Sequence, residues 1–371
     1  MSTNLMRAAR LHEVGGRFRV DRIPVPEVRS TDVLVKVSAT GMVYNLRNVI
    51  SVYPTLRSVL PLPKLPAIFG LDAAGVVAAV GSLVRSGVRV GDRVYVNPGL
   101  VCGCCEACRR GDSTNCPNYT FMGYFGFGPE SQDQYDAYPY GGFGEFLTCP
   151  VANIVKLPDS VSFEQAARFG YLGTSYAALR KARFSPGQTV LVNGGTGTLG
   201  VGTVLLAMAM GAAKIFATGR DQRRLDKLRA LDPHRIQTIA STEGAVAPGI
   251  KDRTGGIGVD VVIDALAPGS PASSVVDAFD ALRSGGIAVN VGGVSEKLAI
   301  EPNRLMILQK ALIGSRWFTT SEGQDMAAMA ESRTLNLDVF EHKVYPLEKV
   351  NEALDEVETR DGGFTNIVIK P

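Results

Sequence analysis

The first third of the chain is built from short runs in which apolar and polar residues alternate. The clearest run, 32–40, places valines at every second position. Because successive side chains of a strand point to opposite faces, this alternation predicts a half-buried strand. Further runs at 93–96 and 153–157 predict two more strands, so this part of the chain is expected to be mainly β.

The middle of the chain changes to short apolar runs that alternate with helical patterns. Segment 221–231 carries Leu225, Leu228 and Leu231 on one face, the spacing of a helix packed on a core. Strands that alternate with helices predict a parallel, doubly wound sheet. The predicted strands are 189–192, 214–218, 259–263 and 287–291, and a second helix is predicted at 274–283.

The end of the chain returns to a mixed pattern. Residues 347–357 place Val350, Leu354 and Val357 on one helix face, and 365–369 has the pattern of a closing strand. A length of 371 residues leaves room for two domains. The sequence therefore predicts an α/β protein that combines a doubly wound parallel sheet with a mainly β domain.

Composition and charge exclude several classes of function. Hydrophobic residues make up 45% and charged residues 20%, as in ordinary globular enzymes. A net charge of +3 gives no reason to expect a nucleic-acid or membrane partner. The first residues, 1–11, lack the apolar core of a secretory signal, and the longest apolar stretch, 199–213, is too short to span a bilayer. We therefore expect a cytoplasmic protein.

A glycine-rich loop follows the predicted strand 189–192. Gly195, Gly197 and Gly200 form the pattern G-x-G-x-x-G between that strand and an apolar helix, which is the context of a dinucleotide-binding turn. The glycines allow a tight turn, and the helix N-terminus attracts a diphosphate. The residues expected to bind the cofactor here are Gly195, Thr196, Gly197, Thr198, Leu199 and Gly200.

The end of the next strand indicates which nicotinamide cofactor is preferred. NAD-specific folds place an acid there to bind the ribose 2′-hydroxyl, whereas this strand ends in Gly219 and Arg220. An arginine can pair with a 2′-phosphate, so the sequence favours NADP(H), with Arg223 and Arg224 assisting. Two alternatives remain: a solvated charge run, and a ribose contact from Asp221, one position late.

Five of the six cysteines lie between positions 102 and 116. Cys102, Cys105, Cys108 and Cys116 have a spacing that can close a tetrahedral zinc site on one loop. Four thiolates leave no open position, so we predict one structural zinc per chain. Cys104 breaks the spacing and is interpreted as a non-ligand. The sixth cysteine, Cys149, is expected in the core.

These features resemble the zinc-containing medium-chain alcohol dehydrogenases over nearly the whole chain. The motifs that carry the resemblance are the four-cysteine lobe, GDRVY from Gly91, GFGEF from Gly142, the glycine-rich loop and PLEKVNEAL from Pro346. The resemblance implies a GroES-like catalytic domain (1–165, with its zinc lobe at about 100–118, and 317–371) interrupted by a Rossmann domain (166–316). It also implies a homodimer or homotetramer, with the nicotinamide between the domains.

The resemblance fails at the catalytic metal. Family members carry a cysteine where this chain has Val43, a histidine where it has Leu71, and a third ligand near Gly170. Asp72 replaces the family's neighbouring acid. Valine, leucine and glycine offer no side-chain ligand, so no catalytic zinc is expected at this position.

The residues around the missing metal are the candidate catalytic groups. Tyr44 is a candidate to hydrogen-bond a developing oxyanion or deliver a proton, or it only fills space. Asn45 is the second candidate donor; it replaces the serine or threonine of the family's proton relay, and Asn48 replaces the relay's histidine. Asp72 is either a general acid or a core hydrogen-bonding group, and Tyr171 is a weaker candidate for the same cleft.

The resemblance also places residues near the nicotinamide. Thr174 matches a position that touches the ring face, and the turn Val291, Gly292 and Gly293 matches one beside the carboxamide. The aromatic segment 119–127 either shapes an apolar substrate pocket or packs around the zinc lobe. The histidines, His12, His234 and His342, lie at no ligand position.

Without a Lewis acid, hydride transfer needs an acceptor that delocalises the incoming charge. The leading hypothesis is thus an NADPH-dependent reductase of a conjugated alkene, an enone or an iminium. A second is a conventional alcohol or aldehyde dehydrogenase with atypical metal ligands, such as Asp72 with water. A third is a non-catalytic NADPH-binding protein.

Overall fold

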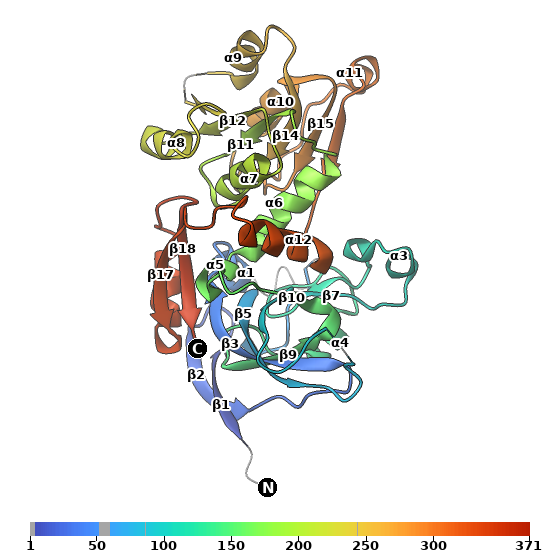
Figure 1. The fold of residues 1–371 in the computed structure, drawn as a ribbon, viewed down its shortest axis with the longest axis vertical. Helices are drawn as coiled ribbons and strands as arrows, with labels where there is room; N and C mark the ends of the chain where they lie inside the picture. The colour runs from blue at the N-terminus through green and yellow to red at the C-terminus, as the bar shows by residue number, and fades with distance from the viewer. Residues whose placement is uncertain (1–3, 52–59, 86, 243) are drawn as a thin grey trace.

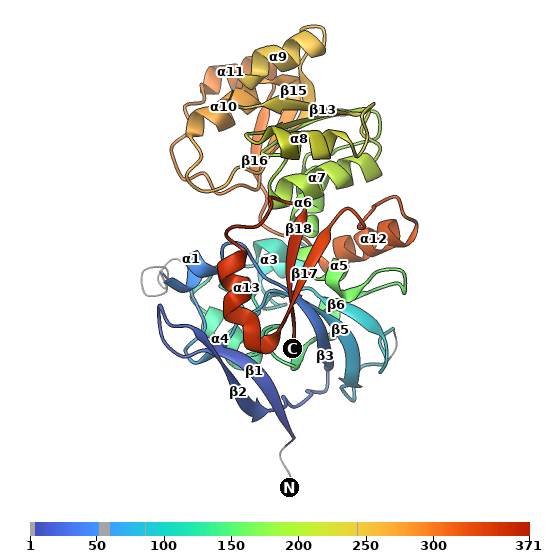
Figure 2. The same ribbon diagram turned by 90° about the vertical axis from the view of Figure 1, so that its left-hand side faces the viewer.

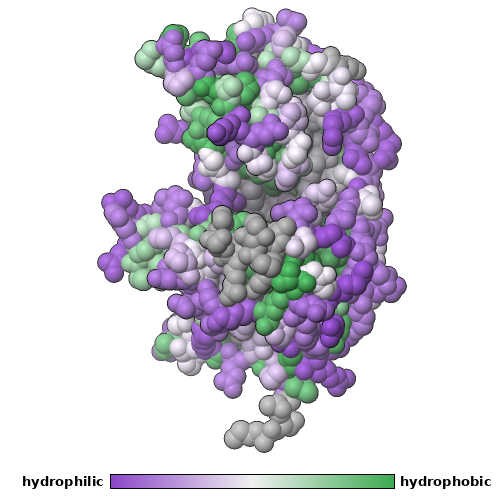
Figure 3. Space-filling model, turned by 180° about the vertical axis from the view of Figure 1, so that it is seen from behind, coloured by the Kyte–Doolittle hydropathy of each residue, from purple (hydrophilic) through white to green (hydrophobic). Residues whose placement is uncertain are grey.

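The computed structural model describes residues 4–51, 60–85, 87–242 and 244–371. The chain forms two lobes, with the elements of residues 189–314 in one and both ends of the chain in the other (Figure 1). Seen from behind, the surface is indented between the two lobes (Figure 3). None of the described helices combines the length and apolar character needed to cross a bilayer.

The lobe that holds both ends of the chain is mainly β. Its larger sheet has the order β10-β6-β5-β3-β18-β17, with β9 paired to β3, and a smaller sheet has the order β2-β1-β4. The strands are β1 (Leu5–Leu11), β2 (Phe18–Pro24), β3 (Asp32–Gly41), β4 (Ala67–Ile68), β5 (Asp72–Val80), β6 (Arg93–Val96), β9 (Phe146–Pro150), β10 (Ile154–Lys156), β17 (Glu341–Pro346) and β18 (Thr365–Lys370).

The alternation predicted for 32–40 is confirmed by β3. Val33, Val35 and Val37 are buried in a core that β5, β6 and β9 also line. At its end β3 pairs with β18, with Gly41 opposite Val368, so the last strand of the chain lies beside the first third. Short helices surround the sheet: α1 (Leu46–Ser51), α4 (Ser131–Ala137), α5 (Phe163–Ala166), α12 (Thr320–Glu331) and α13 (Val350–Glu356).

The second lobe is the predicted doubly wound sheet. Its order is β13-β12-β11-β14-β15-β16 and every recorded pairing in it is parallel. The strands are β11 (Thr189–Asn193), β12 (Lys214–Gly219), β13 (Ile236–Ala240), β14 (Val259–Asp264), β15 (Leu282–Asn290) and β16 (Ala311–Gly314). The helices are α7 (Thr198–Ala209), α8 (Gln222–Arg229), α9 (Val246–Arg253), α10 (Ala272–Asp280) and α11 (Pro302–Leu308).

The predicted helix 274–283 is wrong at its C-terminal end. Helix α10 stops at Asp280, and Leu282 already belongs to β15, where it pairs with Val259. Val275, Phe279 and Leu282 continue a helical spacing and are all buried, so the local pattern did not mark the boundary. The neighbouring strand supplies the hydrogen bonds that end the helix, and a sequence pattern does not contain that partner.

Helix α6 (Phe169–Lys181) connects the lobes and was not predicted. It packs against α7 of the parallel lobe and α12 of the other lobe (Figures 1 and 2). Ten of its thirteen residues are buried. A helix that is buried nearly all round has no polar face, so the amphipathic spacing that reveals surface helices is absent.

Candidate cofactor cleft and active site

The glycine-rich loop has the geometry of a dinucleotide-binding turn. Gly194 has a φ of +82°, and α7 begins immediately after its N-cap residue, Gly197. A Cβ atom at Gly200 would lie 2.2 Å from the carbonyl oxygen of Gly194, so only glycine lets the helix pack this closely on the turn. The free N–H groups of α7 face the carboxyl end of the sheet, where doubly wound folds bind phosphates.

The carboxyl end of β12 lies beside this loop. A Cβ atom at Gly219 would lie 2.9 Å from the side chain of Thr196. Arg220 is exposed, and it has no ion-pair partner within the described residues. Asp221 caps α8, since its Oδ1 accepts from the backbone N–H of Arg224 at 3.2 Å. The Asp221 carboxylate, which the sequence left as an alternative ligand of the ribose, is therefore engaged in capping α8.

The other two arginines of this region are held by the end of the chain. Arg223 and Arg224 both donate to Oδ1 of Asp361, at 2.6 and 2.9 Å. Asp361 lies between Arg360 and the Gly362–Gly363 pair, which contacts the glycine-rich loop. Sequence inspection did not single out this segment, because it is 137 positions from Arg224.

At the other end of the cleft, Asp72 is a buried hydrogen-bonding group. It is 1% exposed, and its Oδ1 accepts from the hydroxyl of Tyr95 at 2.7 Å. Burial raises the pKa of Asp72 to about 7, although the Tyr95 hydroxyl, the Gly170 N–H and the Arg168 charge each act in the opposite direction. This carboxyl group is held in the core rather than facing solvent.

The three positions predicted to match the family's catalytic metal ligands hold apolar residues or glycine. Val43, Leu71 and Gly170 are all buried. A Cβ atom at Gly170 would lie 2.2 Å from Oδ1 of Asp72, so the Asp72 carboxyl fills the space that a ligand side chain at 170 would need. Within the described ranges, only the four-cysteine cluster brings three or more potential metal ligands together.

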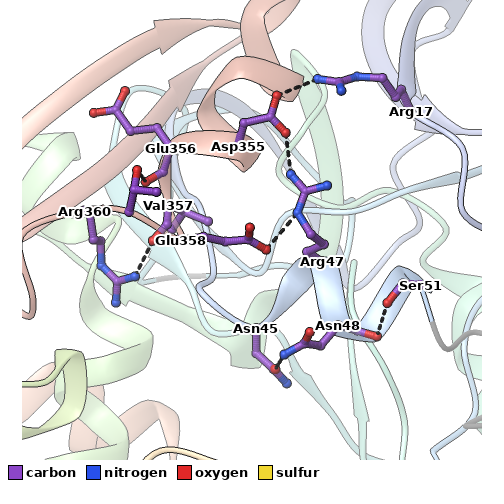
Figure 4. A network of polar contacts seen from close by, with 11 residues as sticks. Arg17, Asn45, Arg47, Asn48, Ser51, Asp355, Glu356, Val357, Glu358 and Arg360 are labelled. Atoms are coloured by element: carbon purple, nitrogen blue, oxygen red, sulfur yellow. Dashed lines mark hydrogen bonds and ion pairs between the residues drawn. The ribbon is translucent and has the colours of Figure 1, made fainter.

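Tyr44 lies at the surface of this region. Its side chain is 42% exposed, and its backbone N–H donates to the hydroxyl of Tyr171 at 2.9 Å. Burial raises the pKa of Tyr171. Asn45 accepts from Asn48 at 2.9 Å between their side-chain amides (Figure 4). Tyr124, a buried residue that the sequence did not single out individually, lies close to Asn45.

The groups expected near the nicotinamide are fixed by the parallel sheet and by α6. Thr174 is buried and its Oγ1 donates to the carbonyl oxygen of Gly170 at 2.8 Å. The Val291 N–H donates to the carbonyl of Asp264 at 2.9 Å, and the Gly293 N–H to that of Leu266 at 2.8 Å. The turn after β15 is thus tied to the chain leaving β14.

Arg168 is a further buried charge that sequence inspection missed. It is 1% exposed at the start of α6, where its guanidinium lies 4.1 Å from the Phe340 ring centre. It donates to the carbonyl oxygens of Thr198, Gly363 and Thr365, and so joins α6, α7 and β18. The signal was a lone arginine inside the apolar run 166–179.

The four predicted zinc ligands come together away from the cleft. The sulfur atoms of Cys102, Cys105, Cys108 and Cys116 all lie within 4.8 Å of one another, and the Cys102 and Cys116 sulfurs are 3.6 Å apart. Tetrahedral zinc with sulfur at 2.3 Å needs a sulfur–sulfur spacing of about 3.8 Å, so the cluster fits the ion. Cys104 is exposed and outside this group.

The aromatic segment 119–127 packs mainly on itself and on the loop before α12. Phe121 contacts the rings of Phe125, Phe127 and Trp317 edge-on. The guanidinium of Arg316 lies 4.2 Å from the Phe127 ring centre. The sequence left two expectations for this segment, a substrate pocket or packing, and packing accounts for the contacts of these rings.

A doubly wound sheet with this loop, joined to a mainly antiparallel lobe with a four-cysteine cluster, defines an NAD(P)-dependent oxidoreductase. Two family models match the chain: "Alcohol dehydrogenase GroES-like domain" over residues 29–159 and "Zinc-binding dehydrogenase" over 198–332. Sorbitol dehydrogenase of Bacillus subtilis is 31% identical over 77% of this chain and 75% of its own. The chain belongs to the zinc-type, medium-chain alcohol dehydrogenase family.

Solved structures agree with this assignment. The crystal structure of AibC superposes with a TM-score of 0.85 and 25% identity, covering 100% of this chain and 97% of that chain. A putative zinc-binding dehydrogenase from Sinorhizobium meliloti, bound to NADP, has a TM-score of 0.81 and 24% identity, covering 99% and 100%. At that identity the second likeness shows the fold alone.

Proposed function

We propose that this chain is an NADPH-dependent reductase of an activated double bond that uses no zinc ion at the site of hydride transfer. One observation carries the proposal: the positions of the usual metal ligands hold Val43, Leu71 and Gly170, and Asp72 fills the space above Gly170. None of these three offers a ligand atom. The curated relatives are named for polyol and alcohol oxidation, so the reaction proposed here departs from theirs.

The preference for NADP(H) rests on the end of β12. Gly219 places no acid at the ribose, Asp221 is engaged in capping α8, and Arg220 is exposed without an anionic partner in the described chain. A guanidinium in this position suits a 2′-phosphate. The Sinorhizobium meliloti protein, which has the same fold, was solved with NADP bound.

NADPH supplies a hydride, and the residues of this chain must then stabilise the charge that hydride transfer leaves on the acceptor. Addition to a conjugated alkene leaves negative charge on the carbonyl oxygen, which one or two hydrogen-bond donors can hold without a metal. An iminium carries its positive charge already and needs less help. The donors proposed to face the acceptor are the exposed hydroxyl of Tyr44 and the side-chain amide of Asn45. Asp72, which is buried beside Gly170, is proposed to assist them.

Replacing Tyr44 by phenylalanine tests this role. If the hydroxyl stabilises the oxyanion or delivers the proton, kcat should fall by about 100-fold, since a positioned acid contributes about 10²–10⁴. The measurement is NADPH oxidation against a panel of enones, enoyl thioesters, iminium ions, ketones and aldehydes. Tyr140→Phe removes a hydroxyl that donates to the Pro24 carbonyl and should leave kcat unchanged. Turnover of ketones alone would contradict the proposal.

Zinc analysis tests the metal assignment. We expect about one zinc per chain, held by the four cysteine thiolates as a closed structural site. Cys116→Ser should lose that zinc, because a serine hydroxyl is a poor replacement for a thiolate, whereas Cys104→Ser should retain it. The measurement is elemental analysis of the purified variants. A content near two per chain in the wild type would instead favour the conventional dehydrogenase, with Asp72 as an atypical ligand.

A further inference from the structure

The last turn of α13 and the segment that follows it are anchored to the N-terminal half of the chain by ion pairs. Arg47 of α1 bonds Asp355 at 2.5 Å and Glu358 at 2.8 Å, and Arg17 bonds Asp355 at 2.8 Å. Figure 4 shows Arg47 between these two acids, with Arg360 on the far side of the segment. Asp355 and Glu358 are therefore paired with other arginines, and Glu356 is paired with Lys343.

The same segment continues across the glycine-rich loop. The Gly363 N–H donates to the Thr196 carbonyl at 2.9 Å, and a Cβ atom at Gly363 would lie 2.1 Å from the Gly197 carbonyl oxygen. Arg360 donates to the side-chain hydroxyl of Thr198, the first residue of α7. The C-terminal segment thus delivers a guanidinium to the N-terminus of the helix that follows the loop.

Arg360 has no carboxylate partner in the part of the chain that the structure describes. Its recorded contacts are the Thr198 hydroxyl, the Val357 carbonyl at 2.6 Å and the Tyr44 ring, whose centre lies 4.5 Å away. Burial lowers its pKa. Asp361, the nearest acid in sequence, is engaged with Arg223 and Arg224. A half-buried cation beside a helix N-terminus, without an anion, is an unusual arrangement because both carry positive charge.

We infer that Arg360, stacked on Tyr44, is a ligand of the cofactor's diphosphate. This inference rests on the proposed binding of NADP(H) at the glycine-rich loop and adds a ligand that comes from the other lobe. A diphosphate at the N-terminus of α7 supplies the missing anion, and its oxygens match the planar donors of a guanidinium. Arg220, which directly follows β12 and has no ion-pair partner among the described residues, serves the 2′-phosphate instead, while Arg223 and Arg224 of α8 are paired with Asp361.

The two groups of arginines make different predictions for different ligands. The diphosphate is common to NADPH and NADH, so Arg360→Leu should raise the dissociation constants of both by about 10- to 100-fold. Their ratio should not change. Adenosine 2′-monophosphate has no diphosphate and should bind the variant and the wild type equally. Arg360→Lys keeps the positive charge but lacks the paired, planar N–H donors of the guanidinium, so it should recover part of the affinity.

The experiment is titration calorimetry of the full chain with NADPH, NADH and adenosine 2′-monophosphate. The matched control is Arg19→Leu, which removes an exposed arginine paired to Glu13 at 3.6 Å and should leave all three constants unchanged. Thermal melting checks that each variant is folded, and Arg360→Lys replaces Arg360→Leu if the latter is not.

Four outcomes are distinguishable. Equal weakening of NADPH and NADH, with adenosine 2′-monophosphate unaffected, supports the inference. Unchanged NADPH affinity in Arg360→Leu, with tight binding by the wild type, overturns it and leaves the proposed function intact. Loss of affinity for adenosine 2′-monophosphate as well also overturns it, because Arg360 would then only hold the loop in place. Failure of the wild type to bind either dinucleotide overturns both proposals.

Discussion

The wild-type protein is expected to lose about 4 kcal/mol of stability, relative to an Asp72→Asn variant, as the pH rises from 4 to 8. The cause is the Asp72 carboxyl group, whose pKa is raised by burial from 3.8 to about 7. Between those two values the unfolded chain releases the proton while the folded chain keeps it. The unfolded state therefore binds fewer protons, and stability falls as the pH rises through this window.

Urea unfolding at a series of pH values measures this effect directly. Below about pH 3 the carboxyl is protonated in both states, and above about 8 it is ionised in both, so the difference between wild type and variant should be flat beyond these two values. Asparagine can still accept from the Tyr95 hydroxyl, so the variant should remain folded. Parallel curves for the two proteins between pH 4 and 8 would show that Asp72 has an ordinary pKa.

Replacing Arg168 by methionine is expected to destabilise the protein by about 3–5 kcal/mol. The guanidinium is the only recorded donor linking the carbonyl oxygens of Thr198, Gly363 and Thr365 within the described residues. Its removal takes one hydrogen bond away from each of these three carbonyl oxygens. It also removes a positive charge that favours the ionised form of Asp72. The measurement is the free energy of unfolding in urea at pH 7.

An exposed arginine supplies the comparison. Arg229 is paired with Asp226 on the surface of α8 at 3.1 Å, and Arg229→Met should change stability by no more than about 0.5 kcal/mol. Arg168→Lys should fall between the two, because a lysine keeps the charge but reaches fewer carbonyls. A loss below 1 kcal/mol for Arg168→Met would mean that water replaces the guanidinium.

The elements whose sequence has a regular hydrophobic repeat were predictable. The alternation of valines identified β3, and the leucine spacing at 225 and 228 identified α8, because in both cases the neighbouring core selects one face of the element. The buried helix α6 and the boundary between α10 and β15 were not predictable in this way. Their side chains are apolar on several faces, and the partner that ends α10 is a strand more than twenty residues earlier.

The residues of the candidate site also fall into those that a local sequence pattern predicts and those that only distant contacts bring together. The glycine-rich loop and the four cysteines each lie within a short stretch of sequence, so their spacing alone is enough to predict their chemistry. The contacts of Asp361 with Arg224, and of Arg360 with Thr198, join residues that are 137 and 162 positions apart. Neither contact leaves a periodic trace in the sequence, because each is made by one side chain of an irregular segment.

The sequence by itself determined the fold class and the four-cysteine cluster, and it predicted the cofactor loop and the lack of metal ligands at 43, 71 and 170, since each of these depends on residue identity at short range. Only the tertiary structure decided what surrounds them. Burial against Gly170 and Tyr95 sets the state of Asp72, and the return of the chain across the glycine-rich loop brings Arg360 there. Both depend on desolvation and on distant neighbours, which chain folding alone provides.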